Sequence, residues 1–238
     1  VTVSEAEGGY SFTGQKIFVS LSPAWTRLSL LGRHGDEIIH GFITRDHEGW
    51  SNTPDWDTLG MRATQSYTTQ LEGVVVEHAR VARRLPVGAN EDPFTIAIFQ
   101  NFLLLVSSVY AGIADRALEL TVEGATSKHS ALDDEAAYSD DPDIRRQAAA
   151  SAIAVDALTP QLETYCSWVD AAGPTPDHWF RLLSGMKHQS VETARSVVDT
   201  ALRIVGGGAY RSSHELSRLQ RDVLAGVYHP SDTEAVHR

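Results

Sequence analysis

A change of hydrophobic period near position 91 divides this 238-residue chain into two parts. Before it, short runs such as 16–20 and 68–76 alternate polar and apolar residues with a period of two. After it, apolar residues recur at spacings of three and four from position 94 to position 122. The sequence therefore predicts an α+β chain, with strands first and helices second.

The first part, residues 1–88, predicts a β domain. Gly14 and Gln15 lie between the alternating runs 10–13 and 16–20, which predicts a tight hairpin turn at these two positions. Further strands are predicted at 28–31, 38–43 and 68–76.

The second part, residues 91–238, predicts an antiparallel helical bundle. Asp92 as a cap and Pro93 in the first turn predict the start of a long helix. Later helices are predicted at 139–172, 177–205 and 213–225, the last of them capped by Ser213. Three glycines at 206–208 end the third of these four helices, and the short connections favour antiparallel packing.

Composition excludes several classes of partner. A formal net charge of −11 argues against a nucleic acid, which needs a basic face. The longest apolar run, 99–109, is interrupted by polar residues and is too short for the roughly 20 residues that span a bilayer, so no membrane segment is expected. Without a visible signal peptide, a cytoplasmic location is expected. The single cysteine, Cys166, excludes an intrachain disulfide and a multi-cysteine metal site, and no metal is predicted.

Both ends of the chain predict that it is a piece of a longer protein. It begins with Val1 rather than Met, in polar sequence that leads directly into a strand. Residues 234–238 stop where another helix would start.

Three linked motifs carry a resemblance to a known family. They are Gly-Gln-Lys-Ile-Phe-Val-Ser at 14–20, Trp-Asp-Thr-Leu-Gly-Met-Arg-Ala-Thr-Gln-Ser at 56–66, and the stretch 206–222, Gly-Gly-Gly-Ala-Tyr followed by Leu-Ser-Arg-Leu-Gln-Arg-Asp. Their order and spacing resemble the acyl-CoA dehydrogenase superfamily. The resemblance implies a middle-domain β-barrel or sandwich fragment followed by the C-terminal antiparallel α-helical bundle, with the family's N-terminal helical domain absent. It also implies a flavin-dependent oxidoreductase that assembles as a homo-oligomer, a tetramer in the full-length form.

The resemblance assigns flavin-binding roles to two groups of residues. Phe18 would shield the flavin ring and Ser20 would hydrogen-bond it, because two residues that are two apart on one strand point to the same face. Gly206, Gly207 and Gly208 would let the backbone approach the cofactor of a neighbouring subunit. Ordinary structural roles are the alternatives: a core phenylalanine, a strand-end hydroxyl and a helix C-cap.

Arg62 is a candidate for substrate binding, with a turn arginine as the alternative. His229 is the candidate catalytic residue, because it occupies the position where most acyl-CoA dehydrogenases carry the glutamate base; a solvated turn histidine is the alternative. Gly124 occupies the position of the family arginine that holds the pyrophosphate of FAD. Without the positive charge of that arginine, the resemblance allows either FAD or FMN as the cofactor.

The sequence differs from the family pattern at two positions, with His229 in place of the glutamate base and Gly124 in place of the arginine. Three functions are compatible with these differences. The first is an acyl-CoA dehydrogenase-like enzyme that acts on CH–CH groups, with an acyl-CoA as its small-molecule substrate. The second is a reduced-flavin monooxygenase of an aromatic or polycyclic substrate, similar to the two-component branch that includes dibenzothiophene monooxygenase and supplied by a flavin reductase. The third is a catalytically inactive structural subunit.

Overall fold

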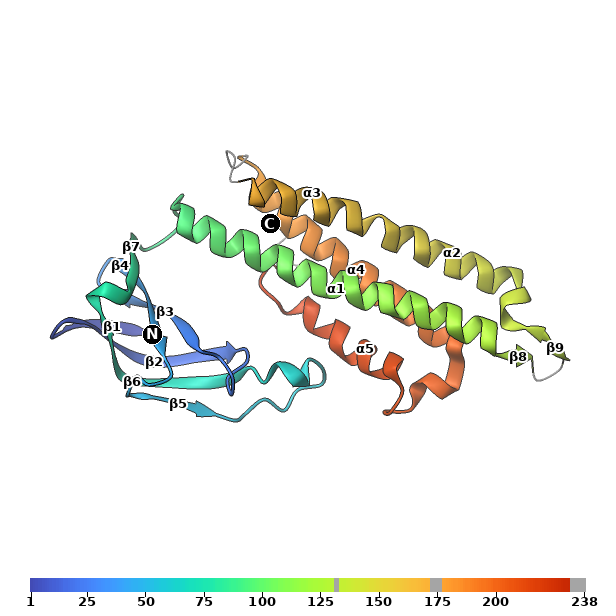
Figure 1. Cartoon of the computed structure of the whole chain (residues 1–238), viewed down its shortest axis with the longest axis horizontal. Coiled ribbons are helices and arrows are strands. Elements are labelled where there is room, and N and C mark those ends of the chain that lie inside the picture. The colour runs from blue at the N-terminus through green and yellow to red at the C-terminus, as the bar shows by residue number, and fades with distance from the viewer. Residues whose placement is uncertain (131–132, 172–176, 232–238) are drawn as a thin grey trace. The chain divides into compact units, whose positions relative to one another are not determined.

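The computed structural model of the chain describes residues 1–130, 133–171 and 177–231. It divides into two compact units, an N-terminal unit (Val1–Ala97) and a C-terminal unit (Ile98–Arg238). Figure 1 shows strands in the first and long helices in the second, which confirms the predicted α+β class.

The N-terminal unit is a seven-stranded sheet in the order β5-β6-β2-β1-β3-β4-β7. Its strands are β1 (Thr2–Ala6), β2 (Gly9–Val19), β3 (Arg27–His34), β4 (Glu37–Thr44), β5 (Trp50–Thr53), β6 (Tyr67–Glu77) and β7 (Val81–Pro86). All neighbouring pairs are antiparallel except β1 with β3, which meet at Thr2 and Arg33. One face buries a cluster that includes Phe12, Leu30, Ile39 and Val74, because inward-facing apolar residues alternate along each strand.

The predicted hairpin at Gly14 and Gln15 is wrong. Both residues lie inside the single long strand β2, where Gly14 pairs with Leu71 and Gln15 with Gln70 of β6. The hairpin instead joins β1 to β2 just before Gly9, with Gly8 at a φ of 77°. Gly14 has a φ of 137°, so the glycine is needed for an irregular strand conformation rather than for a turn.

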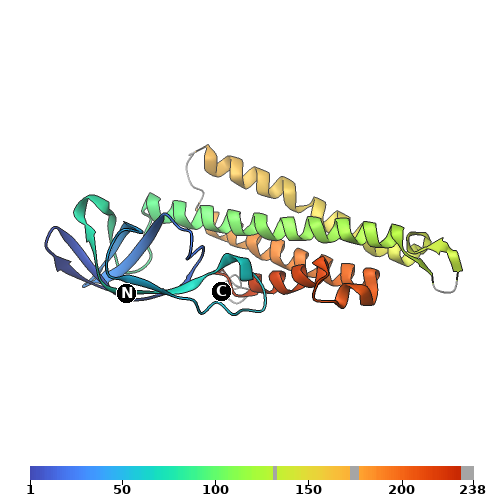
Figure 2. The same ribbon diagram turned by 60° about the horizontal axis from the view of Figure 1, so that its bottom comes forward.

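The C-terminal unit is an antiparallel helical bundle, as predicted. Its helices are α1 (Pro93–Ser127), which begins in the N-terminal unit, α2 (Pro142–Asp156), α3 (Leu158–Asp170), α4 (Trp179–Val205) and α5 (Glu215–Val223). A short hairpin of β8 (His129–Ser130) and β9 (Asp133–Ala137) follows α1. Figures 1 and 2 show α2 and α3 running back along α1, and α5 running back along α4.

Two helix boundaries differ from the predictions. The predicted helix 139–172 is two helices, which meet at Ala157. Pro160 explains the break, since it cannot donate a backbone hydrogen bond to the carbonyl of Asp156 and its ring crowds that carbonyl. The predicted cap Ser213 is also wrong, because Nδ1 of His214 accepts the backbone N–H of Leu216 at 3.1 Å and caps α5.

Helix α1 changes one expectation about membranes. By length and composition alone it is long and apolar enough to cross a bilayer, contrary to the expectation that no run approaches that length. One such helix is weak support for a membrane span, because the central helix of a bundle has the same composition. Several of its buried residues, including Leu103, Leu104 and Ala111, pack into a core shared with α3 and α4.

Candidate functional site

Backbone strain among the described residues is confined to two places. Five non-glycine residues have a positive φ: Phe18 (58°), Leu21 (57°), Met61 (52°), Gln65 (42°) and Ser231 (59°). Four of them lie in the N-terminal unit, at the end of β2 and in the loop between β5 and β6, and Ser231 lies near the end of the bundle. Because such conformations cost about 1–3 kcal/mol each and cluster at functional sites, both places are candidate sites.

In the N-terminal unit, hydrogen bonds join the end of β2 to the loop 55–66. The backbone N–H of Leu21 donates to the carbonyl of Thr64 at 2.8 Å, and that of Ser22 to the carbonyl of Gln65 at 3.2 Å. Asp55 anchors the loop to β6, because the hydroxyl of Thr68 donates to its carboxylate at 2.6 Å. The hydrogen bonds from Thr68 hold the pKa of Asp55 below its usual range, so the anchor stays ionised.

Phe18 and Trp56 form an exposed aromatic edge on this loop junction. Phe18 lies in a register shift between Lys16 and Val19, and the residue is 68% exposed. Its ring meets the ring of Trp56 edge-on, with the centroids 6.0 Å apart. The indole N–H of Trp56 donates to the carbonyl of Met61 at 3.0 Å, which fixes the ring. Phe18 is therefore not a core phenylalanine, which was the alternative to its role in flavin binding.

Ser20 belongs to a chain of three hydroxyls beside this edge. Its Oγ lies 3.0 Å from Oγ of Ser66, which lies 2.8 Å from Oγ1 of Thr64. The predicted reason for grouping Phe18 with Ser20 is wrong, because β2 ends at Val19 and Phe18 is in a bulge. Loop hydrogen bonds, rather than strand alternation, set their positions. Their roles in flavin binding stay predictions.

Arg62 has local partners in this structure. Its guanidinium donates to the carboxylate of Asp57 at 2.9 Å and to the carbonyl of Thr58 at 2.6 Å. These contacts are those of an arginine that stabilises its own turn, which was the alternative to substrate binding. A substrate role for Arg62 stays a prediction.

In the C-terminal unit, His229 lies between α1 and α4. Its Nδ1 is 3.2 Å from the hydroxyl of Tyr110 on α1. On α4, Nζ of Lys187 donates to the carbonyls of Gly226 at 2.8 Å and His229 at 3.2 Å. Neither Tyr110 nor Lys187 is more than 2% exposed. The turn that contains His229 is therefore held by buried polar groups.

The electrostatics of this turn keep both rings uncharged near neutral pH. Burial, together with the positive charge of Lys187, holds the pKa of His229 below its usual range. Burial, with the carboxylate of Asp222 nearby, raises the pKa of Tyr110. His229 is thus a half-buried neutral imidazole, which contradicts the alternative of a solvated turn histidine.

The three glycines lie directly after α4, as predicted. The helix ends at Val205, whose carbonyl accepts the ammonium of Lys128, and Gly206 has a φ of 74°. Apart from the chain neighbours, no atom of the described residues lies within 4 Å of a Cβ built on Gly206 or Gly207. The backbone is therefore open to a ligand, and cofactor binding by Gly206, Gly207 and Gly208 stays a prediction.

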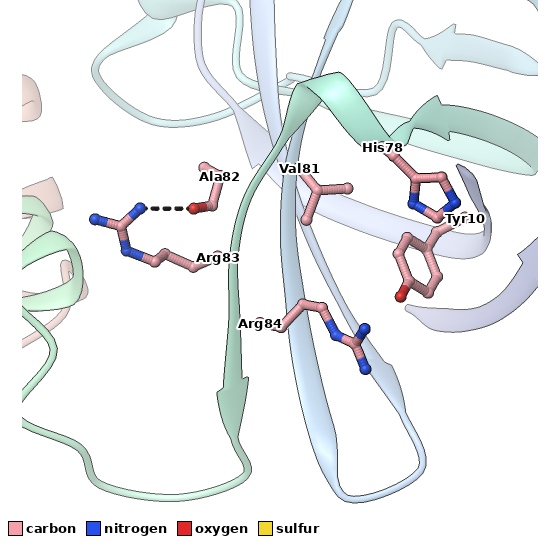
Figure 3. Close-up of a pocket in the computed structure, with 6 residues that line it drawn as sticks. All are labelled: Tyr10, His78, Val81, Ala82, Arg83 and Arg84. Carbon is pink, nitrogen blue, oxygen red and sulfur yellow. Dashed lines mark hydrogen bonds between the residues drawn. The ribbon is translucent and has the colours of Figure 1, made fainter. Parts of the chain in front are cut away.

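A depression on the N-terminal unit is a poor candidate for chemistry. Tyr10, His78 and residues 81–84 line it (Figure 3). Its two arginines have partners: Arg84 donates to Glu37 at 2.6 Å, and Nε of Arg83 lies 3.4 Å from Asp92. The site also lacks a strained residue.

Residues 104–231 match the family model of the acyl-CoA dehydrogenase C-terminal domain. The chain belongs to this family. It is 28% identical over 244 residues to an L-evernosamine nitrososynthase from a Micromonospora species, a match that covers 94% of the chain and 54% of that protein. It is 34% identical over 135 residues to dibenzothiophene monooxygenase from Mycolicibacterium goodii, covering 52% of the chain and 32% of that protein.

Among solved structures, the crystal structure of a nitrososynthase from Micromonospora carbonacea var. africana is 26% identical, with a TM-score of 0.79. The match covers 99% of this chain and 61% of that one. The chain thus spans little more than half the length of these nitrososynthases. The resemblance to the acyl-CoA dehydrogenase superfamily, including its dibenzothiophene monooxygenase branch, is confirmed.

Against this family, Gly124 is a packing position. A Cβ at Gly124 would lie 2.6 Å from Cγ2 of Val205, so α1 and the end of α4 touch here. An arginine does not fit at this point without moving one of the helices. The contact between α1 and the end of α4 therefore leaves no room for a side chain at position 124.

Sequence reasoning missed three residues of the two sites. Trp56 was noted only as part of a motif, and Tyr110 and Lys187 were not singled out. Lys187 had a signal, because it follows Leu183 and precedes Val191 at spacings of four on the buried face of α4. A lysine in an apolar stripe predicts a buried charge that needs partners.

Proposed function

We propose that the whole protein is a flavin-dependent oxidoreductase that oxygenates the nitrogen of a small amine. The flavin part rests on the family and on the N-terminal site. A flavin needs a planar apolar surface with hydrogen-bonding groups beside it. The exposed ring of Phe18 and the hydroxyls of Ser20 and Ser66 supply both, on a strained loop junction.

The observation that carries the choice of reaction is the hydrogen bond between Tyr110 and His229. The buried Tyr110 keeps its proton because its pKa is raised, and Nδ1 of His229 is 3.2 Å from its hydroxyl oxygen. We assign the hydroxyl as donor to Nδ1. A neutral imidazole then carries its own proton on Nε2, so it offers the substrate site an N–H donor.

An N–H donor suits oxygen transfer better than dehydrogenation. Removing the α-proton of an acyl thioester needs a lone pair facing the substrate, as a carboxylate base provides. An N–H instead stabilises negative charge that develops on oxygen during the reaction. His229 is therefore proposed as a hydrogen-bond donor rather than as the base of a dehydrogenase.

The overall reaction balances as a monooxygenation. One atom of O2 is added to the amine nitrogen, and the other leaves as water with two protons and two electrons. A reduced flavin held beside Phe18, Ser20 and Ser66 would supply the two electrons. The similarity to proteins named as nitrososynthases favours nitrogen over the aromatic or polycyclic substrates expected from the sequence.

Acyl-CoA dehydrogenation is the second candidate, because the chain belongs to the acyl-CoA dehydrogenase family and a neutral imidazole can also accept a proton. It needs the opposite tautomer, in which Nδ1 of His229 donates to Tyr110. The inactive structural subunit has no support from the geometry, since strained backbone and buried polar groups are maintained at both sites.

Several partners belong to the proposal. The packing of Gly124 against Val205 leaves no cation at the pyrophosphate position, which favours FMN over FAD. Reduced flavin implies a flavin reductase as a partner. A homo-oligomer is proposed because, in this family, the open glycine loop faces the cofactor of another subunit.

An oxygen-isotope experiment tests the proposal. The full-length protein is incubated with a flavin reductase, FMN, NADH, 18O2 and a panel of small amines that includes amino sugars. We expect a product that is heavier by one 18O atom on nitrogen and that requires the enzyme, with a rate that falls in His229→Ala. Formation of an enoyl-CoA from an acyl-CoA, without a reductase, would establish the second candidate instead.

A further inference from the structure

Lys187 is a buried cation in the middle of α4. Its side chain is 2% exposed and lies on the same helix face as Leu183 and Val191, both of which are buried. Burying an ammonium is costly unless hydrogen bonds replace its water. The neighbours that supply those bonds show what the lysine holds in place.

Three backbone carbonyls of the segment 226–231 surround the ammonium of Lys187. Its Nζ lies 2.8 Å from the carbonyl oxygen of Gly226, 3.2 Å from that of His229 and 3.0 Å from that of Ser231. A lysine ammonium has three N–H donors, so each carbonyl can receive one. The side chain therefore fixes both ends and the middle of this turn.

The turn is strained where the lysine holds it. Ser231 has a φ of 59°, which a residue with a side chain rarely adopts, and its Oγ lies 3.1 Å from Oγ of Ser184, also on α4. Gly226 is packed so closely that a Cβ would lie 2.7 Å from Val191. The turn is thus held against α4 at several points, and the imidazole of His229 projects from its centre toward Tyr110.

We propose that Lys187 is a positioning residue, which fixes the turn 226–231 so that Nδ1 of His229 stays on the hydroxyl of Tyr110. This inference rests on the proposed role of His229. Among the residues that the structure describes, the charged and titratable groups that act on the imidazole and its partner are Lys187 on α4, Tyr110 on α1 and Asp222 on α5, whose carboxylate acts on Tyr110. The positive charge of Lys187 also opposes protonation of His229, so orientation and charge state depend on the same side chain.

The titration of His229 tests this role without relying on activity. Diethyl pyrocarbonate modifies neutral imidazoles, so its rate of reaction at His229, followed by peptide mass against pH, reports the pKa of that residue. In the full-length protein we expect a pKa below the ordinary value of about 6.5. Lys187→Met and Lys187→Gln should both move it up toward that value, because the opposing charge is gone.

Turnover against pH is the second readout. In the Lys187 variants we expect a loss of about tenfold or more in kcat at neutral pH, since a displaced proton donor is costly. The acid limb of the kcat profile should also move to higher pH. Lys187→Gln keeps polar hydrogens beside the carbonyls and serves if Lys187→Met does not fold.

Two variants serve as controls for the titration. Lys128→Met removes another lysine that donates to a backbone carbonyl, at the far end of α4, and should leave the pKa of His229 unchanged. Ser184→Ala removes one contact to Ser231 but keeps the charge, and should also leave the pKa unchanged.

A folded Lys187→Gln protein in which His229 titrates as in the wild type would overturn the proposal, whatever its turnover. Absence of flavin-dependent turnover in the wild type would instead count against the proposed function, while the titration would still decide the role of Lys187.

Discussion

The hydroxyl of Tyr110 lies 3.2 Å from Nδ1 of His229, across 119 positions of sequence. This pair joins the long helix α1 to the turn that follows α5. It also decides which imidazole nitrogen is left for a substrate, so the function proposed for the whole protein depends on it.

Replacing Tyr110 by phenylalanine removes the hydroxyl and keeps the ring. We expect kcat with reduced flavin to fall by about tenfold, since a positioned acid–base group contributes about 10²–10⁴-fold and this variant loses only the orientation of His229. The affinity for flavin should not change. Steady-state kinetics and a flavin titration check both expectations, with Tyr165→Phe in the same bundle as the control; equal loss in the two variants would contradict a specific role.

The lowered pKa of His229 makes stability depend on pH in one direction. The unfolded chain binds a proton at His229 below about pH 6.5, while the folded protein resists it. This contribution to stability is therefore fully present above about pH 6.5 and is lost as the pH falls toward the lower, folded pKa. Urea unfolding between pH 7.5 and pH 5 should show a weaker dependence on pH in His229→Gln than in the wild type. Identical slopes would show that His229 titrates normally.

Gly226→Ala should destabilise the protein by about 1–3 kcal/mol, the usual cost of overpacking. A Cβ at this position would lie 2.7 Å from both Cγ atoms of Val191 and 2.9 Å from Cζ of Tyr110. Gly185→Ala is the matched control, because no other atom lies within 4 Å of its Cβ and it is inside α4. That control should instead stabilise by about 0.5–1 kcal/mol through helix propensity. Chemical denaturation of the two variants measures both effects, and a neutral Gly226→Ala would contradict the close packing.

Phe18→Ala should weaken flavin binding by about tenfold, since an aromatic contact with a flat ring is worth about 0.5–1.5 kcal/mol beyond its buried area. The side chain is exposed, so the stability of the protein should change little. Val87→Ala, an exposed apolar residue after β7, is the control. A fluorescence titration with FMN checks the prediction. Unchanged affinity would mean that Phe18 does not form the flavin surface.

Much of the fold could be predicted from local sequence patterns. The change from period two to period 3.6 placed the strands and the helices, and Pro93 and the glycines 206–208 marked helix ends correctly. The errors arose where tertiary contacts override local signals. Gly14 is typical of a hairpin turn, yet it pairs with Leu71 of β6, so that β2 continues as one strand through this position. The break at Ala157 follows from Pro160, because a proline removes the helical hydrogen bond to the carbonyl four residues earlier in the chain.

The candidate site could be predicted only in part. His229 could be chosen because a motif placed it, but its partners lie 42 and 119 positions away on other helices. No periodic pattern reports which helices meet, so Tyr110 could not be singled out from its place in the sequence. Phe18 and Ser20 do lie at one loop junction, but strand alternation, which was the reason for grouping them, does not place them there, and their roles in flavin binding stay predictions.

A titration of the full-length protein with oxidised and reduced FMN and FAD, followed by anaerobic addition of acyl-CoA thioesters, tests the central claim most directly. We expect that reduced FMN binds most tightly and that no acyl-CoA bleaches a bound oxidised flavin. Tight binding of oxidised FAD, bleached anaerobically by an acyl-CoA, would contradict it and make His229 the base of a dehydrogenase.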